Sequence, residues 1–94
     1  ALFVANDIAA LGAIAAAQDA SLRVPADVSV VGYDGIALGA LRTISLTTVA
    51  QPLARMGALA AARLFERIDR PTVRARHDNV DAALIARGTT APPP

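Results

Sequence analysis

The pattern of apolar and polar positions along the 94-residue chain predicts strands alternating with helices. The chain opens on an unbroken apolar run, Ala1 to Ala5, which is typical of a strand buried on both faces of a parallel sheet. Asn6 and Asp7 follow, and apolar residues then recur at helical spacing from Ile8 to Ala20. Because Asn is a good N-cap and an acid suits the positive end of the helix dipole, we expect a helix to begin here.

A second strand is expected over Val28 to Tyr33, where β-branched residues follow a break at Pro25. Strand, helix and strand in so short a stretch form a βαβ unit, which is almost always right-handed. Ile36 to Arg42 is long enough for a short helical turn, and Leu46 to Ala50 is expected as a third strand.

The clearest amphipathic helix is expected from Pro52 to Asp69. Proline is favourable at the first helical position, since its missing N–H costs nothing there. Glu66 stands four residues before Arg70 and is expected to pair with it. The expected apolar face comprises Leu53, Met56, Gly57, Ala60, Leu64 and Ile68. The expected polar face comprises Arg55, Arg63, Glu66, Arg67 and Arg70.

Pro71 ends this helix. Two further strands are expected, Val73 to His77 and Ala82 to Ala86, and the polar, proline-rich residues from Thr89 to Pro94 are expected to form a frayed tail. A length of 94 residues allows at most one small domain, and the order of elements predicts that it is of the α/β class, with no internal repeat.

Composition excludes several classes of protein. The formal net charge of +1 gives no electrostatic basis for direct binding of nucleic acid, because neutralised phosphates dominate that affinity. The chain has no cysteine, so disulfides and thiolate metal sites are excluded. No apolar run reaches the ~20 residues that span a bilayer, and we expect no membrane partner. Because the chain opens at Ala1 without an initiator Met, we expect it to be a piece of a longer protein.

The sequence carries no catalytic signature. His77 is the only histidine, so a paired-histidine zinc site is excluded and this side chain is expected to be solvated. No serine stands in a G-x-S-x-G context, no phosphate-binding G-x-G-x-x-G follows a strand, and no acidic pair marks a general acid and base. We therefore expect no enzyme activity, no catalytic residue, no metal and no cofactor.

Polar side chains follow three of the expected strands: Asn6, Asp34 and Gln51. If these strands are parallel, their carboxyl ends meet at the edge where open α/β sheets bind ligands. Amides donate and accept hydrogen bonds and a carboxylate accepts them, a combination that suits the hydroxyl groups of a sugar or nucleoside. Simpler roles remain open: Asn6 as an N-cap, Asp34 as a turn residue before Gly35, and Gln51 as a cap of the next helix.

Four stretches of the sequence resemble the lactose-repressor (LacI/GalR) family of bacterial transcription regulators, in family order across essentially the whole chain. They are Val4-Ala-Asn-Asp7 with Ala10-Leu-Gly12, Val24-Pro-Ala-Asp-Val-Ser-Val-Val-Gly-Tyr-Asp34, Leu46-Thr-Thr-Val-Ala-Gln-Pro52, and Arg87-Gly-Thr-Thr90. The resemblance implies a type I periplasmic-binding-protein-like fold, which is a three-layer α/β fold with parallel sheets. Two lobes hold an effector in the cleft between them, and the chain would supply part of this domain.

The resemblance also implies roles for particular residues. The chain would be the C-terminal part of the effector-binding domain of a cytoplasmic repressor, which binds DNA through a separate helix-turn-helix outside this chain. Asn6 and Asp34 would contact the effector, a sugar or nucleoside, and Gln51 would lie near the cleft. The homodimer surface of the family would include Leu11, Leu38, Leu41 and Arg42. For Leu11, core packing is an equally compatible role.

By the same resemblance, residues 1–51 would form a βαβ-β portion of one lobe, residues 52–80 a crossing helix and strand, and residues 81–94 the last strand and tail. Without the other lobe, the helix from Pro52 is expected either to fold back on the chain's own sheet or to be exchanged with a second copy. Gly35 replaces an acid common in the family and is expected to widen the pocket or loosen the loop. Two other functions stay open: a periplasmic sugar-binding protein of a transporter, and an interaction module that binds no small molecule.

Overall fold

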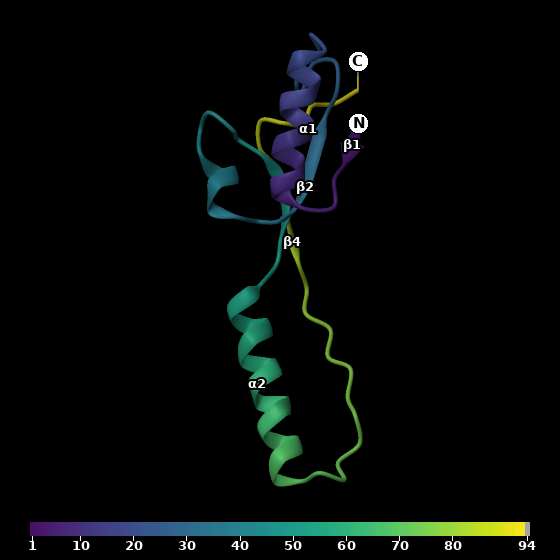
Figure 1. The fold of residues 1–94 in the computed structure, drawn as a ribbon, viewed down its shortest axis with the longest axis vertical. Coiled ribbons are helices and arrows are strands. Elements are labelled where there is room, and N and C mark those ends of the chain that lie inside the picture. The colour runs from purple at the N-terminus through teal and green to yellow at the C-terminus, as the bar shows by residue number, and fades with distance from the viewer. Residues whose placement is uncertain (94) are drawn as a thin grey trace. The chain divides into compact units, whose positions relative to one another are not determined.

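The computed structural model describes residues 1–93, which form two compact units. The first unit is made of residues 1–51 together with the residues from Ala83 onward, and the second is made of Pro52–Ala82. Figure 1 labels the helices and strands of both units along the chain.

The first unit is a four-stranded sheet, in the order β1 (Leu2–Phe3), β2 (Val30–Asp34), β3 (Thr47–Ala50) and β4 (Ala83–Ile85). The first three strands are parallel, as the sequence predicts, and β4 is antiparallel to β3. Helix α1 (Asp7–Asp19) connects β1 to β2 and packs against β2, which confirms the βαβ unit (Figure 1). The expected helical turn is present as the short 3₁₀ helix η1, Ala37–Ala40.

A small core lies between α1 and the sheet. Ala10, Val30 and Leu46 are fully buried at its centre. Gly32 faces α1, and a Cβ at this position would lie 3.3 Å from the Cβ of Ala10 and 2.3 Å from Oδ1 of Asp7. Small residues on both elements therefore permit the close approach of helix and strand. Around this centre pack the half-buried side chains of Val4, Ile14, Val24 and Ile44.

The prediction of a first strand buried on both faces is wrong. Leu2 and Phe3 are 45% and 71% exposed. Strand β1 has only two residues and pairs with β2 alone among residues 1–93. An edge strand this short receives little cover from a single neighbour, so an apolar run alone does not identify a buried strand.

The prediction of a frayed tail is also wrong where the tail begins. Thr89 is only 4% exposed. Its Oγ1 accepts a hydrogen bond from the Thr47 N–H at 2.9 Å and donates one to the Val30 carbonyl at 2.7 Å, while the Val30 N–H donates to the Thr89 carbonyl at 2.8 Å. Thr89 thereby satisfies backbone groups at the first residues of β2 and β3, which would otherwise be buried without partners.

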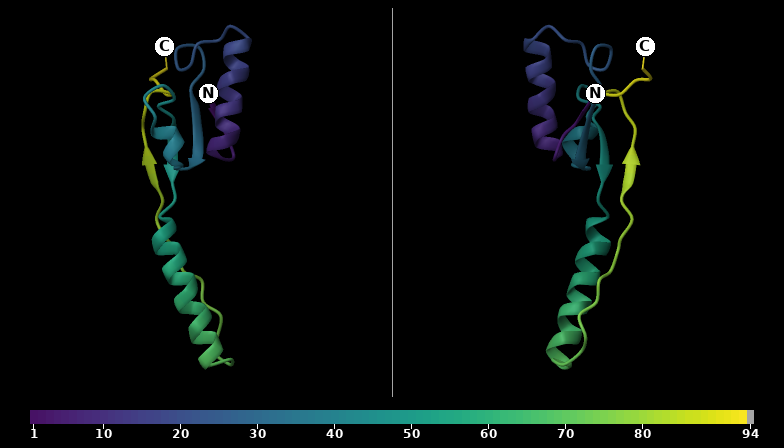
Figure 2. Two further views of the ribbon diagram at one scale, coloured as in Figure 1. Left: turned by 60° about the vertical axis from the view of Figure 1, so that its left-hand side comes forward. Right: turned by 90° about the vertical axis from the view of Figure 1, so that its right-hand side faces the viewer.

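The second unit consists of helix α2 (Leu53–Asp69) and residues 71–82, the return segment, which runs back along the helix (Figure 2). The helix has the predicted bounds except that Pro52 is its N-cap residue. The strand predicted over Val73 to His77 is not formed. Instead of pairing with another strand, this stretch is bound by side chains, as Arg76 donates to Glu66 of the helix.

The face of α2 that the return segment covers differs from the predicted apolar face. Leu59, Arg63 and Glu66 are its half-buried residues, and no residue of the helix is fully buried. Arg63 therefore lies beside apolar neighbours instead of opposite them. The predicted pair of Glu66 with Arg70 is present at 3.2 Å. What covers the apolar face of α2 remains a prediction from the sequence.

Candidate ligand-binding site

Asp34 and Gln51, the rim pair, meet at the carboxyl ends of β2 and β3. The Gln51 side chain donates from Nε2 to Oδ1 of Asp34 at 2.7 Å, and its backbone N–H donates to the Asp34 carbonyl at 3.3 Å. The strand register explains the contact, because Asp34 lies opposite Ala50, the residue before Gln51. The predicted convergence at this edge of the sheet is confirmed for these two residues.

The backbone at Asp34 is strained. Its φ of 118° lies in a region that residues with a side chain rarely adopt, and Gly35 follows with a φ of 75°. A Cβ on Gly35 would stand 2.6 Å from the Cβ of Ala50. Gly35 therefore holds the turn closely against β3, which corrects the expectation that it loosens the loop. Strain of this kind is concentrated at binding and active sites, since the surrounding structure must maintain it.

The simpler roles predicted for Asn6 and Gln51 have different outcomes. Asn6 is the N-cap of α1, and its Oδ1 accepts the Ala9 N–H at 2.7 Å. Its side chain is exposed, and its amide N–H groups make no hydrogen bond within residues 1–93. Gln51 does not cap α2, because the N-cap of that helix is Pro52 and no side chain bonds there. The amide of Gln51 is directed to Asp34 instead.

Asp7, a residue that the sequence did not reveal as part of the site, organises it. Its side chain is fully buried at the start of α1. Oδ2 accepts the backbone N–H groups of Gly35 at 2.9 Å and Ile36 at 2.8 Å, and Oδ1 accepts the Thr48 hydroxyl at 2.5 Å. One carboxylate therefore ties the helix to the turn after Asp34 and to β3. The sequence indicated only an acid in the first helical turn, which predicts an interaction with the helix dipole.

The rim pair can bind a ligand through hydrogen bonds. Within the described chain, Oδ2 of Asp34 and Oε1 of Gln51 make no hydrogen bond and are acceptors for hydroxyl groups, and the amide nitrogen of Gln51 has a second N–H. Residues 1–93 contain no cluster of three or more His, Cys, Asp or Glu side chains that could hold a metal ion. None of the described helices is both long and apolar enough to cross a membrane.

Two of the four residues expected at a dimer surface line a groove of the first unit. The groove has a volume of about 510 Å³, and Leu11 and Arg42 line it. Leu11 is half-buried and lies outside the core cluster. Leu38 and Leu41 are exposed on and just after η1. Large apolar side chains are thus exposed on the segment where the resemblance implies a partner.

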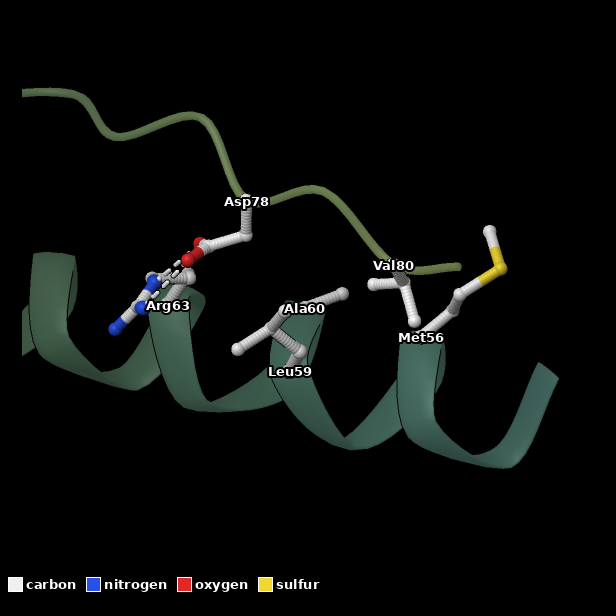
Figure 3. A pocket seen from close by; sticks show the side chains of 6 residues that line it. All are labelled: Met56, Leu59, Ala60, Arg63, Asp78 and Val80. Atoms are coloured by element: carbon white, nitrogen blue, oxygen red, sulfur yellow. Dashed lines mark hydrogen bonds and ion pairs between the residues drawn. The ribbon is translucent and has the colours of Figure 1, made fainter. Parts of the chain in front are cut away.

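A second cavity, of about 240 Å³, lies within the second unit between α2 and the return segment. Figure 3 shows apolar side chains along most of its wall and the pair of Arg63 with Asp78 at one end. Arg63 donates from Nε at 2.7 Å and from Nη2 at 2.9 Å, so both carboxylate oxygens of Asp78 are used. This cavity offers a polar ligand few hydrogen-bonding groups, and the rim pair is the better candidate site. The other lining residues are Met56, Leu59, Ala60 and Val80.

The parallel sheet with ligand-type side chains at its carboxyl edge is characteristic of binding-protein folds. The family model described as "Periplasmic binding protein-like domain" matches residues 1–90, and the chain belongs to this family. Its relatives include the HTH-type transcriptional repressor PurR of Edwardsiella ictaluri, 43% identical over all 94 residues, which cover 28% of that protein. The ribose operon repressor of Escherichia coli K12 is 39% identical over 89 residues, covering 95% of this chain and 27% of that repressor.

Solved structures of LacI-family regulators are also similar to this chain. A LacI family regulator of Enterococcus faecalis with bound ribose matches with a TM-score of 0.86 and 34% identity, over 96% of this chain and 34% of that one. A dimeric Lac repressor matches with a TM-score of 0.84 and 35% identity, over 98% of this chain and 34% of that one. The relatives are thus LacI-family repressors, which are not enzymes, and the chain spans less than a third of the length of the curated ones.

Proposed function

We propose that this chain is the C-terminal part of the effector-binding domain of a LacI-type transcription repressor and supplies one rim of its effector cleft. The observation that carries this function is the rim pair, two hydrogen-bonding side chains joined at the carboxyl ends of adjacent parallel strands. Relatives that are repressors favour this function over a periplasmic transport protein. The ligand-bound structures among them favour it over a module that binds nothing small.

The effector we propose is a sugar or a nucleoside. Asp34 and Gln51 retain acceptors and a donor for vicinal hydroxyl groups, and Asn6, which follows the first strand, retains its amide donors. Ribose is bound in two regulators of the same fold, and cellobiose in a third. The opposing wall of the cleft, and with it much of the specificity, would come from residues outside this chain.

The organisation of the protein follows from the same proposal. Residues 1–51 and 81–94 belong to one lobe, and residues 52–80 cross to the other. The protein acts in the cytoplasm, binds DNA through a separate helix-turn-helix, and has no catalytic activity. It forms a homodimer through Leu11, Leu38, Leu41 and Arg42, which lie along the groove of the first unit or on the exposed segment beside it.

The test is calorimetric titration of the full-length gene product with ribose and a panel of other sugars and nucleosides. Asp34→Ala should weaken the binding of the effector at least about tenfold, since a charge-assisted hydrogen bond is lost. Asp19→Ala, which removes an exposed acid at the far end of α1, is the matched control and should change nothing. Equal affinities of the two variants would contradict the site. No binding across the panel would favour the interaction module.

A further inference from the structure

The small net charge of the chain conceals a local excess of positive charge in the second unit. Between residues 63 and 76 the sequence has five arginines and two acids, Glu66 and Asp69. These arginines lie on the last turns of α2 and on the beginning of the return segment. The absence of an electrostatic basis for direct binding of nucleic acid therefore applies to the net charge of the whole chain and not to this part of it.

Glu66 is the acid at the centre of this group, and its carboxylate is already shared. It pairs with Arg70 at 3.2 Å, with Arg63 at 3.5 Å and with Arg76. Its side chain is only 16% exposed. The hydrogen bond from Arg76 is the main cause that lowers the pKa of Glu66, so this group stays ionised near neutral pH. One negative charge thus serves three guanidinium groups, of which Arg63 also binds Asp78.

A pocket of about 110 Å³ opens beside this group. Four arginines line it, Arg63, Arg67, Arg74 and Arg76, and Glu66 is the only acid among its lining residues. Arg67 and Arg74 make no ion pair within residues 1–93. A pocket of this volume holds several water molecules and is therefore large enough for a small tetrahedral oxyanion.

We propose that this arginine pocket binds a phosphate-type oxyanion. Guanidinium groups present planar pairs of N–H donors that match the oxygens of phosphate, and charge-assisted bonds of this kind are the strong ones. The bound anion would supply the negative charge that Arg67 and Arg74 lack. It reaches the protein either as a free phosphate compound or as a backbone phosphate of nucleic acid. The site is separate from the effector rim and does not depend on the function proposed for that rim.

A competing explanation is a solvated cluster. Cations near the carboxyl end of a helix are favoured by the helix dipole, with no ligand needed. Such a cluster would attract anions weakly, and the loss of any one arginine would have about the same effect. A binding pocket would instead lose affinity only when an arginine that lines it is removed. The two explanations therefore differ in the effect of single substitutions.

The experiment is calorimetric titration of the full-length gene product with inorganic phosphate at low ionic strength. Arg67→Gln should weaken phosphate binding at least about tenfold. Arg55 is an exposed arginine of the same helix outside the pocket, and Arg55→Gln should change the affinity for phosphate by no more than about twofold. Both positions are helical and Gln is a good helix former, so circular dichroism should show unchanged folding. Absence of binding, or equal loss in both variants, overturns the proposal.

To identify the source of the anion, the binding of a duplex DNA of arbitrary sequence is measured by fluorescence anisotropy. If the duplex binds, if Arg67→Gln weakens that binding, and if inorganic phosphate displaces the duplex, the pocket is assigned to the nucleic-acid backbone. Arg67-dependent binding of phosphate without binding of the duplex would assign it to a free phosphate compound. Arg67→Lys should bind more weakly than wild type, because it retains the charge and loses the planar pair of donors. If it binds phosphate as tightly as wild type, the bidentate geometry is wrong.

Discussion

Thr48 donates its hydroxyl proton to Oδ1 of Asp7 at 2.5 Å, and both side chains are fully buried although they lie 41 residues apart. The other oxygen of the same carboxylate accepts the N–H groups of Gly35 and Ile36. A buried charge is tolerated only when it is well hydrogen-bonded, so these groups depend on one another. The position of Asp34, one residue before the turn that Asp7 holds, depends on this arrangement.

Replacing Asp7 should therefore destabilise the first unit strongly. Asp7→Ala leaves two half-buried N–H groups and a buried hydroxyl without an acceptor, at a cost of about 3 kcal/mol or more. Asp7→Asn should cost less, because its amide oxygen can still accept from the turn while its amide donates to Thr48. Urea unfolding at neutral pH measures the loss of unfolding free energy in both variants. Asp19→Ala on the same helix is the control, expected within about 0.5 kcal/mol of wild type. Equal effects at the two positions would refute the role of Asp7.

Much of the fold could be predicted from the sequence because its signals are local. Apolar spacing predicted both long helices, and β-branched runs predicted β2 and β3. The rim pair could be predicted as well, since residues that follow parallel strands meet at one edge. What the sequence did not reveal was the link between Asp34 and Gln51 themselves, which requires the register of the two strands.

The errors share a physical cause, namely partners that are distant in sequence. From the sequence alone, Asp7 is expected only to interact with the helix dipole, because its backbone partners lie 28 and 29 residues away. The polar composition around Thr89 predicts a frayed tail, whereas the Thr89 hydroxyl hydrogen-bonds the backbone of Thr47 and Val30 in place of a strand partner. Val73 to His77 has residues that suit a strand, but it pairs with no neighbouring strand. A side-chain hydrogen bond from Arg76 to Glu66 of α2 binds it instead.

A pair of glycine substitutions should have opposite effects on stability. Gly35→Ala introduces a Cβ at a φ of 75° and within 2.7 Å of two atoms of Ala50, and we expect it to destabilise by about 2 kcal/mol or more. Gly12→Ala adds a Cβ that meets nothing within 4 Å on α1 and should stabilise by about 0.5–1 kcal/mol. Thermal unfolding gives both values. A neutral Gly35→Ala would show that the turn is not held closely against β3.

Removal of the Thr89 hydroxyl should weaken the sheet. Thr89→Val keeps the shape of the side chain but leaves the Thr47 N–H and the Val30 carbonyl without a partner, at a cost of about 2 kcal/mol. Thr43→Val, at an exposed threonine, is the matched control and should be nearly neutral. Amide hydrogen exchange at Thr47 is the direct measurement, with faster exchange expected in Thr89→Val alone. Unchanged protection of Thr47 would mean that the tail does not anchor β3.

The ion pair between Arg63 and Asp78 should weaken in acid. The hydrogen bond from Arg63 is the main cause that holds the pKa of Asp78 below its ordinary 3.8, against desolvation, which raises it. A lowered pKa means that the ion pair stabilises the unit fully above the ordinary pKa and that this stabilisation is lost as pH falls through the lowered value. Carbon NMR titration of the Asp78 carboxyl should give a midpoint below 3.8. Arg63→Gln should raise that midpoint and Arg55→Gln should not; equal midpoints in the two variants would contradict the pairing.

Dimerisation through the first unit is tested most directly at Leu41. This side chain is 51% exposed beside η1, on the segment that the resemblance places at a homodimer interface. Leu41→Asp introduces a charge that an apolar interface cannot solvate, so the full-length protein should sediment as a monomer. Leu22→Asp changes a similarly exposed leucine outside the proposed surface and should leave the dimer intact. A wild-type monomer, or a Leu41→Asp variant that still dimerises, would rule out this surface.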